Sequence, residues 1–180
     1  MSKCHWVNYK NPLYIKYHDE EWGIPSYNDI YLFEMLLLES FQAGLSWECI
    51  LNKRESFRTA FNNFDYYKIA KYDEQKISEL MSNKDIVRNK LKINATIKNA
   101  RIFIDIQKEY SSFSNYIWHF TNYKTIKNTT EKIPTSSNLS DKISNDLYKR
   151  GMRFVGTTII YSYLEAIGII NDHELTCEKY

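Results

Sequence analysis

The sequence predicts a single all-α domain, and three observations support this class. A chain of 180 residues can bury a real core and is usually one domain. Apolar residues make up 43% of the chain and charged residues 26%, which is the ordinary balance of a globular protein. Apolar positions recur at helical spacing, and no alternating run is long enough to build a sheet. We therefore expect one domain over residues 1–180.

Helix start and stop signals place the elements along the chain. Residues 1–27 show no clear period and contain Pro12 and Pro25, so we expect an ordered arm with short turns. A buried helix should follow, because the segment after Asn28 is apolar on nearly every side. The expected helices run from Asn28 or Asp29 to about Ala43, from a cap at Ser46 to about Phe61, briefly after Asp65 and after Asp73, over 89–110, over 112–121, from Ser140 to Arg150, and from Thr157 to about Ile167. A Thr/Ser-rich loop should cover 122–138.

Each end of the chain carries half of a metal-ligand set. Cys4 and His18 lie near the start, and His173 and Cys177 lie near the end. Two thiolates and two imidazoles complete a tetrahedral structural zinc site. The sequence therefore predicts one structural Zn²⁺ per chain that joins the N- and C-terminal segments.

The cellular compartment expected for the protein indicates whether Cys4 and Cys177 bind a metal or form a disulfide. Cys4 and Cys177 would form a disulfide in a secreted protein. The first residues, however, do not resemble a signal peptide, and the longest apolar run, Met35–Leu38, is far too short to span a membrane. We expect a cytoplasmic protein without a membrane partner, in which metal binding is favoured.

Glu39 is unusual because it lies within an apolar helical segment. Its helix neighbours offer no cation, and an unpaired buried carboxylate is costly. One interpretation is that Glu39 bonds to buried amides or hydroxyls, or emerges at the helix end. The functional interpretation is that it faces a pocket and accepts hydrogen bonds from a ligand.

Aromatic residues surround this segment and make up 16% of the chain. Tyr14, Tyr17 and Trp22 lie on the N-terminal arm and can reach one site together with Trp47. If a metal holds His18, it also fixes the neighbouring Tyr17. Such rings would attract a flat cationic ligand through cation–π interactions.

The segment near the C-terminus reads as helix, short turn, helix. Gly151 and Gly156 bound the turn, and Arg150 and Arg153 add local positive charge to a chain with a net charge of only +2. Amides at a helix start make an anion site, and here they belong to Gly156, Thr157 and Thr158. This arrangement suits contacts to a DNA backbone, although an ordinary αα-hairpin would share the pattern.

Taken together, these motifs give the chain a family resemblance. It resembles the bacterial 3-methyladenine DNA glycosylase I family, of the helix-hairpin-helix glycosylase superfamily, along nearly its whole length. The matching motifs are Cys4 with Trp6, Tyr14 to Gly23, Leu38 to Trp47, Ile133 to Ser136, Lys149 to Thr158, and Asn171 to His173 with Cys177.

The resemblance implies a fold, an activity and site roles. The fold would be a helix-hairpin-helix glycosylase domain with a zinc clasp. The enzyme would flip and hydrolytically excise N3-methylated adenine from double-stranded alkylated DNA, as a monomer, releasing free 3-methyladenine and leaving an abasic site. Glu39 would be the catalytic and base-recognising residue. The rings of Tyr14, Tyr17, Trp22 and Trp47 would surround the base, and Gly44 and Leu45 would probe the gap in the duplex.

Some residues depart from this pattern, and other functions stay open. Phe41 stands where a polar residue is expected, and His5 is an alternative ligand beside Cys4. No lysine stands out as a Schiff-base former, so no lyase activity is expected. A non-enzymatic DNA-binding protein, a zinc hydrolase and a small-molecule binding protein are rival functions. Four protein ligands would leave no open position for a catalytic zinc.

Overall fold

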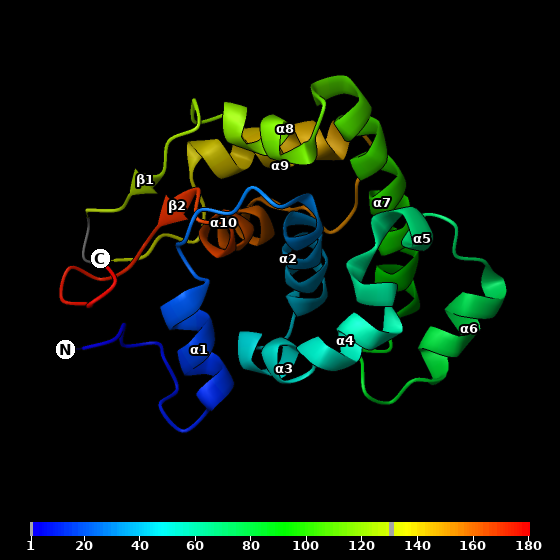
Figure 1. The fold of residues 1–180 in the computed structure, drawn as a ribbon, viewed down its shortest axis with the longest axis horizontal. Coiled ribbons are helices and arrows are strands. Elements are labelled where there is room, and N and C mark those ends of the chain that lie inside the picture. Colours follow the sequence, from blue (N-terminus) through cyan, green and yellow to red (C-terminus); the bar gives the residue numbers. More distant parts are fainter. Residues whose placement is uncertain (1, 130–131) are drawn as a thin grey trace.

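The computed structural model describes residues 2–129 and 132–180, and it is mainly helical (Figure 1). Its α-helices are α1 (Pro12–Glu20), α2 (Asp29–Gln42), α3 (Trp47–Asn52), α4 (Arg54–Ala60), α5 (Tyr66–Ile69), α6 (Glu74–Ser82), α7 (Lys90–Tyr110), α8 (Phe113–His119), α9 (Asn138–Lys149) and α10 (Thr157–Ala166), with a 3₁₀ turn, η1, at Asn62–Phe64. None of the described helices is both long enough and apolar enough to cross a membrane.

Helix α2 forms the centre of the fold. Every residue from Leu32 to Phe41 on it is buried, as its nearly continuous apolar sequence predicts. It packs against α10 on one side and against α7 and α8 on others. Because α2 is enclosed, any polar side chain on it must find a partner or face a cavity.

Several expected boundaries are confirmed. Asn28 caps α2, Ser46 caps α3, and the side chains of Asp65 and Asp73 cap α5 and α6. Each accepts a hydrogen bond from a backbone amide of the first turn, which satisfies a donor that the helix leaves unpaired. Short polar side chains before apolar runs are therefore reliable start signals in this chain.

Other boundaries were wrong. The arm over residues 1–27 contains helix α1, which starts at Pro12 because proline suits the first helical position and Asn11 caps it. The helix expected to run to Phe61 is interrupted at Lys53. Helix α9 is capped by Ser137, while Ser140 occupies the third helical position of a capping box.

A small parallel pair was also not expected. Strand β1 (Ile126–Lys127) pairs with β2 (Ile170–Asn171), with Ile126 opposite Ile170. Strands of two residues are too short to show an alternation of apolar and polar residues, so no sequence pattern predicts them. The pairing holds the segment after α8 against the C-terminal segment.

The two ends of the chain lie on the same side of the molecule (Figure 1). Ser2 pairs with Cys177 through an isolated parallel bridge. The Lys3 ammonium donates to Asp19 at 2.6 Å and to Glu178 at 2.9 Å. These contacts bring the first and last residues together beside α1.

Gly168 lets the loop before α2 pack against the end of α10. Its φ is +75°, and a Cβ at this position would lie 2.2 Å from the backbone carbon of Ile24. We predict that Gly168→Ala lowers the free energy of unfolding by at least about 3 kcal/mol, because backbone strain and a backbone clash add.

Urea unfolding measures this loss. Gly156→Ala is the matched control, since a Cβ there meets nothing within 4 Å and φ is −60°. It should cost less than about 1 kcal/mol. Equal stability of Gly168→Ala and wild type would contradict the packing described for this loop.

Candidate functional site

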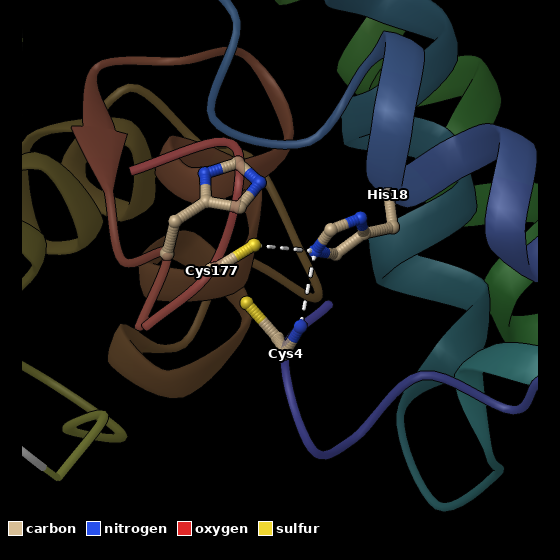
Figure 2. A group of neighbouring side chains, drawn as sticks. Cys4, His18 and Cys177 are labelled. Carbon is tan, nitrogen blue, oxygen red and sulfur yellow. Dashed lines mark hydrogen bonds between the residues drawn. The ribbon is translucent and has the colours of Figure 1, made fainter. Parts of the chain in front are cut away.

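Cys4, His18, His173 and Cys177 form one buried cluster. Their ligand atoms all lie within 4.8 Å of one another. Nε2 of His18 lies 3.4 Å from Cys177 Sγ and accepts from the backbone amide of Cys4 at 3.4 Å, while the Cys4 sulfur lies on the side of Cys177 (Figure 2). The structure thus brings together the four residues that the sequence proposed as metal ligands.

The surroundings of the cluster fit a metal ion. Nδ1 of His18 contacts Asp19 Oδ1 at 2.7 Å, and Nδ1 of His173 contacts Asn171 Oδ1 at 2.8 Å. Such partners orient histidine ligands through the other ring nitrogen. Nε2 of His173 is buried and has no hydrogen-bond partner in the structure. A buried nitrogen of this kind indicates a ligand position.

Burial favours the neutral form of both kinds of side chain in the cluster, which suits a histidine ligand but not a thiolate. Burial lowers the pKa of His173 to about 4, so its imidazole is neutral near pH 7. Burial raises the pKa of the Cys4 thiol to about 12. Backbone amides of Glu174 and Lys179 lie 3.5 Å and 3.4 Å from the sulfurs of Cys4 and Cys177. A bound cation would stabilise the thiolates that burial otherwise disfavours.

His5 lies outside this cluster. Its side chain is 81% exposed, and its Nδ1 contacts the carboxylate of Glu174. His5 is therefore not positioned to act as a ligand in place of any of the four clustered residues.

A cavity of about 220 Å³ lies beside the cluster. It is smaller than the roughly 300–1,000 Å³ of pockets for drug-sized molecules, so it suits a compact ligand. The residues that line it are Trp6, Tyr14, Tyr17, Trp22, Glu39, Gln42, Trp47, Ile133, Ser162 and Glu165. All five residues proposed for a base pocket are among them. Two of the lining side chains carry carboxyl groups and none of those described is basic, which favours a cationic ligand.

The cavity and the cluster share a wall of two indole rings. Trp6 lies with its ring centroid 5.4 Å from that of His18, and Trp22 lies 4.7 Å from His173. The two indoles also contact each other at 4.7 Å. Trp6 was not proposed for the pocket, because it lies within the N-terminal arm where no period indicates which way a side chain points. The position of this wall follows from the position of the cluster.

Glu39 faces this cavity without a protein partner for one of its oxygens. Its residue is 3% exposed, and Oε2 is buried and makes no hydrogen bond in the structure. Burial raises the pKa of Glu39 to about 8. The buried Nε1 groups of Trp6 and Trp47 are likewise without partners. Unpartnered donors and acceptors on one cavity wall are typical of a ligand site.

A second carboxyl group on the cavity was missed by sequence reasoning. Glu165 lies on α10 and is 7% exposed. Burial, with Asp172 nearby, raises its pKa well above the ordinary value. Its main-chain oxygen accepts from the amide of Gly23 at 2.9 Å, which ties α10 to the arm that carries Trp22. A glutamate in the sequence of an amphipathic helix gives no sign that it faces a cavity.

The residues proposed for DNA contact form two tips. Gly44 and Leu45 lie between α2 and α3, and Leu45 is 42% exposed. The other tip is the turn between α9 and α10, where Gly151 has a φ of +104° and Gly156 precedes the first turn of α10. Thr157 and Thr158 begin that helix, as expected.

The side chain of Arg150 is paired within the protein, which its position beside the expected turn does not indicate. Its guanidinium donates to Glu109 at 2.6 Å and to Asp146 at 2.7 Å, and it lies over the rings of Tyr110 and Tyr116. Its charge is therefore paired within the protein, where it joins α9 to the end of α7. The DNA contact assigned to Arg150 stays a prediction.

Phe41, the departure from the family pattern, is fully buried. Its ring packs edge-on against Phe57 at 4.9 Å and against Phe61 at 5.9 Å. It is not among the residues that line the cavity. Phe41 thus belongs to the core between α2 and the Phe57–Phe61 segment. A phenylalanine in place of the expected polar residue does not alter the lining of the cavity.

Comparisons with known proteins agree with this site. The sequence matches the family described as methyladenine glycosylase over residues 6–180. It is 44% identical over 183 residues to DNA-3-methyladenine glycosylase 1 of Escherichia coli, covering 100% of this chain and 97% of that protein. The crystal structure of a 3-methyladenine DNA glycosylase I has 42% identity, a TM-score of 0.94 and 98% coverage of both chains. A Staphylococcus aureus structure solved for its 3-methyladenine recognition has 35% identity, a TM-score of 0.94, and covers 99% of this chain and 96% of that one.

The fold and the cavity therefore define an enzyme, a hydrolase that acts on N-glycosyl bonds. With a match over nearly the whole sequence, the chain belongs to the methyladenine glycosylase family.

The buried state of Glu39 predicts a pH-dependent cost in stability. Since burial raises its pKa from 4.5 to about 8, the folded state holds a proton that the unfolded state releases. The free energy of unfolding of the wild type should therefore fall as the pH rises from about 4.5 to about 8. Glu39→Gln should remove that fall. Between pH 6 and pH 8 the variant should gain roughly 2 kcal/mol relative to wild type.

Urea unfolding of both proteins at the two pH values measures the difference. A constant difference across the window would show that Glu39 is not held protonated by burial. Glu48→Gln is a control, because this carboxylate already accepts hydrogen bonds from Asn8 and Asn11 at 2.8 Å.

Proposed function

We propose that this protein excises N3-methylated adenine from alkylated double-stranded DNA in base excision repair. The observation that carries the proposal is Glu39, a buried carboxyl group with an unpartnered oxygen in a ring-lined cavity. A methylated base in DNA is flat and cationic, and its amino edge donates hydrogen bonds. Such a base would donate a hydrogen bond to the unpartnered oxygen of Glu39. It would also bring a positive charge into a cavity whose described lining has no basic residue.

Glu39 acts by distinguishing the methylated base from normal adenine. Near neutral pH its carboxyl is largely protonated in the free pocket, since its pKa is about 8. A cationic base favours the carboxylate form, so the proton leaves as the base enters. Neutral adenine provides no such charge and gains less from the same pocket.

The reaction breaks the bond between the sugar and the base. The bonding electrons pass to the base and neutralise its positive charge, so this leaving group needs little acid catalysis. Water adds to C1′ of the sugar and loses a proton. The products are free 3-methyladenine and an abasic site. The chain acts as a monofunctional glycosylase, because none of the described cavity-lining residues is a lysine that would form a Schiff base.

The two tips hold the duplex while the base is extruded. A Cβ at Gly44 or Gly156 would meet nothing within 4 Å, so both backbones are open to a partner. Leu45 fills the gap left by the flipped nucleotide. The amides at the start of α10 and the side chain of Arg153 contact phosphates, which position the enzyme without reading sequence. The protein works as a monomer in the bacterial cytoplasm.

One structural Zn²⁺ would be held by Cys4, His18, His173 and Cys177. When bound, it supplies the charge that stabilises two thiolates and links the two ends of the chain. Four protein ligands leave it no position for a reacting water. The support for this assignment is the buried donor set and the unpartnered Nε2 of His173.

We predict that wild type releases 3-methyladenine from methylated duplex DNA and that Glu39→Gln lowers kcat/KM by about a hundredfold. The amide keeps the shape of the side chain but loses the charge that favours the cationic base. Chromatography of the released bases measures the rate. Glu48→Gln, outside the cavity lining, should release the base at the wild-type rate.

The same reactions test the rest of the proposal. Treatment with borohydride should trap no covalent complex with DNA. Release of no base by folded, metal-loaded wild type would exclude the glycosylase function, and a trapped complex would exclude a monofunctional mechanism.

We also predict one Zn²⁺ per purified chain. Cys177→Ser should lose the metal, because a serine hydroxyl is a poor zinc ligand. Elemental analysis measures the content. Cys49→Ser is the control, since Cys49 lies outside the cluster and should leave the content unchanged. Retention of a full equivalent by Cys177→Ser would contradict the assignment.

A further inference from the structure

Helix α7 contacts both DNA-facing tips through buried polar side chains. Lys92 and Asn99 lie seven residues apart, which is about two helical turns, so they share one face of the helix. Lys92 is 6% exposed and Asn99 is 4% exposed. A lysine is rarely buried to this degree unless its ammonium has a specific role.

Lys92 holds the tip that precedes α3. Its ammonium donates to the main-chain oxygens of Phe41 at 2.8 Å and Ala43 at 2.7 Å. These carbonyls belong to the last turn and the cap of α2, where a cation also suits the helix dipole. Gly44 follows at once with a φ of +82°, and then comes the exposed Leu45. Lys92 thus fixes the point at which the chain leaves α2 toward Leu45.

Asn99 holds the other tip. Its side chain accepts from the amide of Arg153 at 2.9 Å and donates to the Arg153 carbonyl at 2.8 Å. The next two carbonyls of this turn are also bound by side chains. The Ser40 hydroxyl on α2 is shared between the carbonyls of Phe154 at 3.0 Å and Leu36 at 2.7 Å, and Ser144 on α9 donates to Val155 at 2.7 Å.

These bonds account for the strained backbone of the turn. Phe154 has a φ of +55°, which is costly for a residue with a side chain. Three successive carbonyls held by three different helices keep the backbone in this conformation. The turn therefore cannot shift relative to α2 and α7 without breaking these part-buried hydrogen bonds.

We propose that Lys92 and Asn99 are positioning residues that set the separation between the Leu45 tip and the α9–α10 turn. Base extrusion requires Leu45 to enter the duplex while the turn grips the backbone, so the two must lie at a defined distance. Neither residue is among those that line the cavity. Their effect is on extrusion from duplex DNA and not on the affinity of the pocket for the free base. This inference rests on the proposed glycosylase function.

The first variant is Lys92→Met, which keeps the length of the side chain and removes the donors. The kcat for base release from duplex DNA should fall by about tenfold or more, because a displaced tip no longer meets the gap. The fluorescence of 2-aminopurine beside an abasic analogue, which reports unstacking, should rise on binding wild type but not this variant. The Kd for free 3-methyladenine, from tryptophan fluorescence, should stay within about twofold of wild type.

Lys108→Met is the matched control. It removes one lysine from the same helix, where the ammonium is exposed and pairs with Asp105 at 2.8 Å. It should behave as wild type in all three measurements.

Asn99→Asp tests the other contact and decides the question if Lys92→Met does not fold. It keeps the acceptor for the Arg153 amide but places an anion against the Arg153 carbonyl. Duplex affinity should fall by about fivefold or more with an unchanged Kd for the free base. Equal losses of free-base binding and duplex activity, or full duplex activity in both variants, would overturn the proposal. Absence of base release by wild type would instead refute the glycosylase function itself.

Discussion

The contact between two indole rings and two histidines is the constraint on which this site depends. Trp6 and Trp22 line the cavity on one side and pack against His18 and His173 on the other. The rings belong to an N-terminal arm with a single short helix, which has little core of its own to hold it. We therefore propose that the joined ends of the chain help to give the pocket its shape.

A second constraint is the cost of an ionisable group at the centre of the fold. Helix α2 is buried over most of its length, and Glu39 interrupts its apolar surface without a protein partner for Oε2. An apolar residue here would be more stable in the free protein. Under the proposed function, the bound base supplies the missing partner and offsets this cost. The Leu45 tip follows the end of the same helix, so the proposed sites of base recognition and duplex contact are joined by one rigid element.

Much of the fold and site could be predicted from the sequence, for identifiable reasons. The cap residues and the continuous apolar character of α2 have local physical causes, and Cys4, His18, His173 and Cys177 are chemically distinctive in any context. One failure was local, because Asn11 before Pro12 is a helix start signal that the sequence interpretation did not use. The other failures depend on tertiary contacts. Trp6 and Glu165 become pocket residues only when the ends and α10 come together. The pairing of Arg150 with Glu109 and Asp146 likewise depends on tertiary contacts and has no local sequence signal, while its contact with DNA stays a prediction.

The proposed pocket for the base depends on the cluster at the chain ends, because the cluster supports the indole wall of the cavity. The most direct test is the Kd for free 3-methyladenine before and after removal of metal by a chelator, with helix content followed by circular dichroism. We expect the affinity for free 3-methyladenine to fall by about tenfold or more while most helix content remains, and added Zn²⁺ to restore that affinity. Unchanged affinity in metal-free protein would contradict the claim, because the indole wall would then keep its place without the cluster.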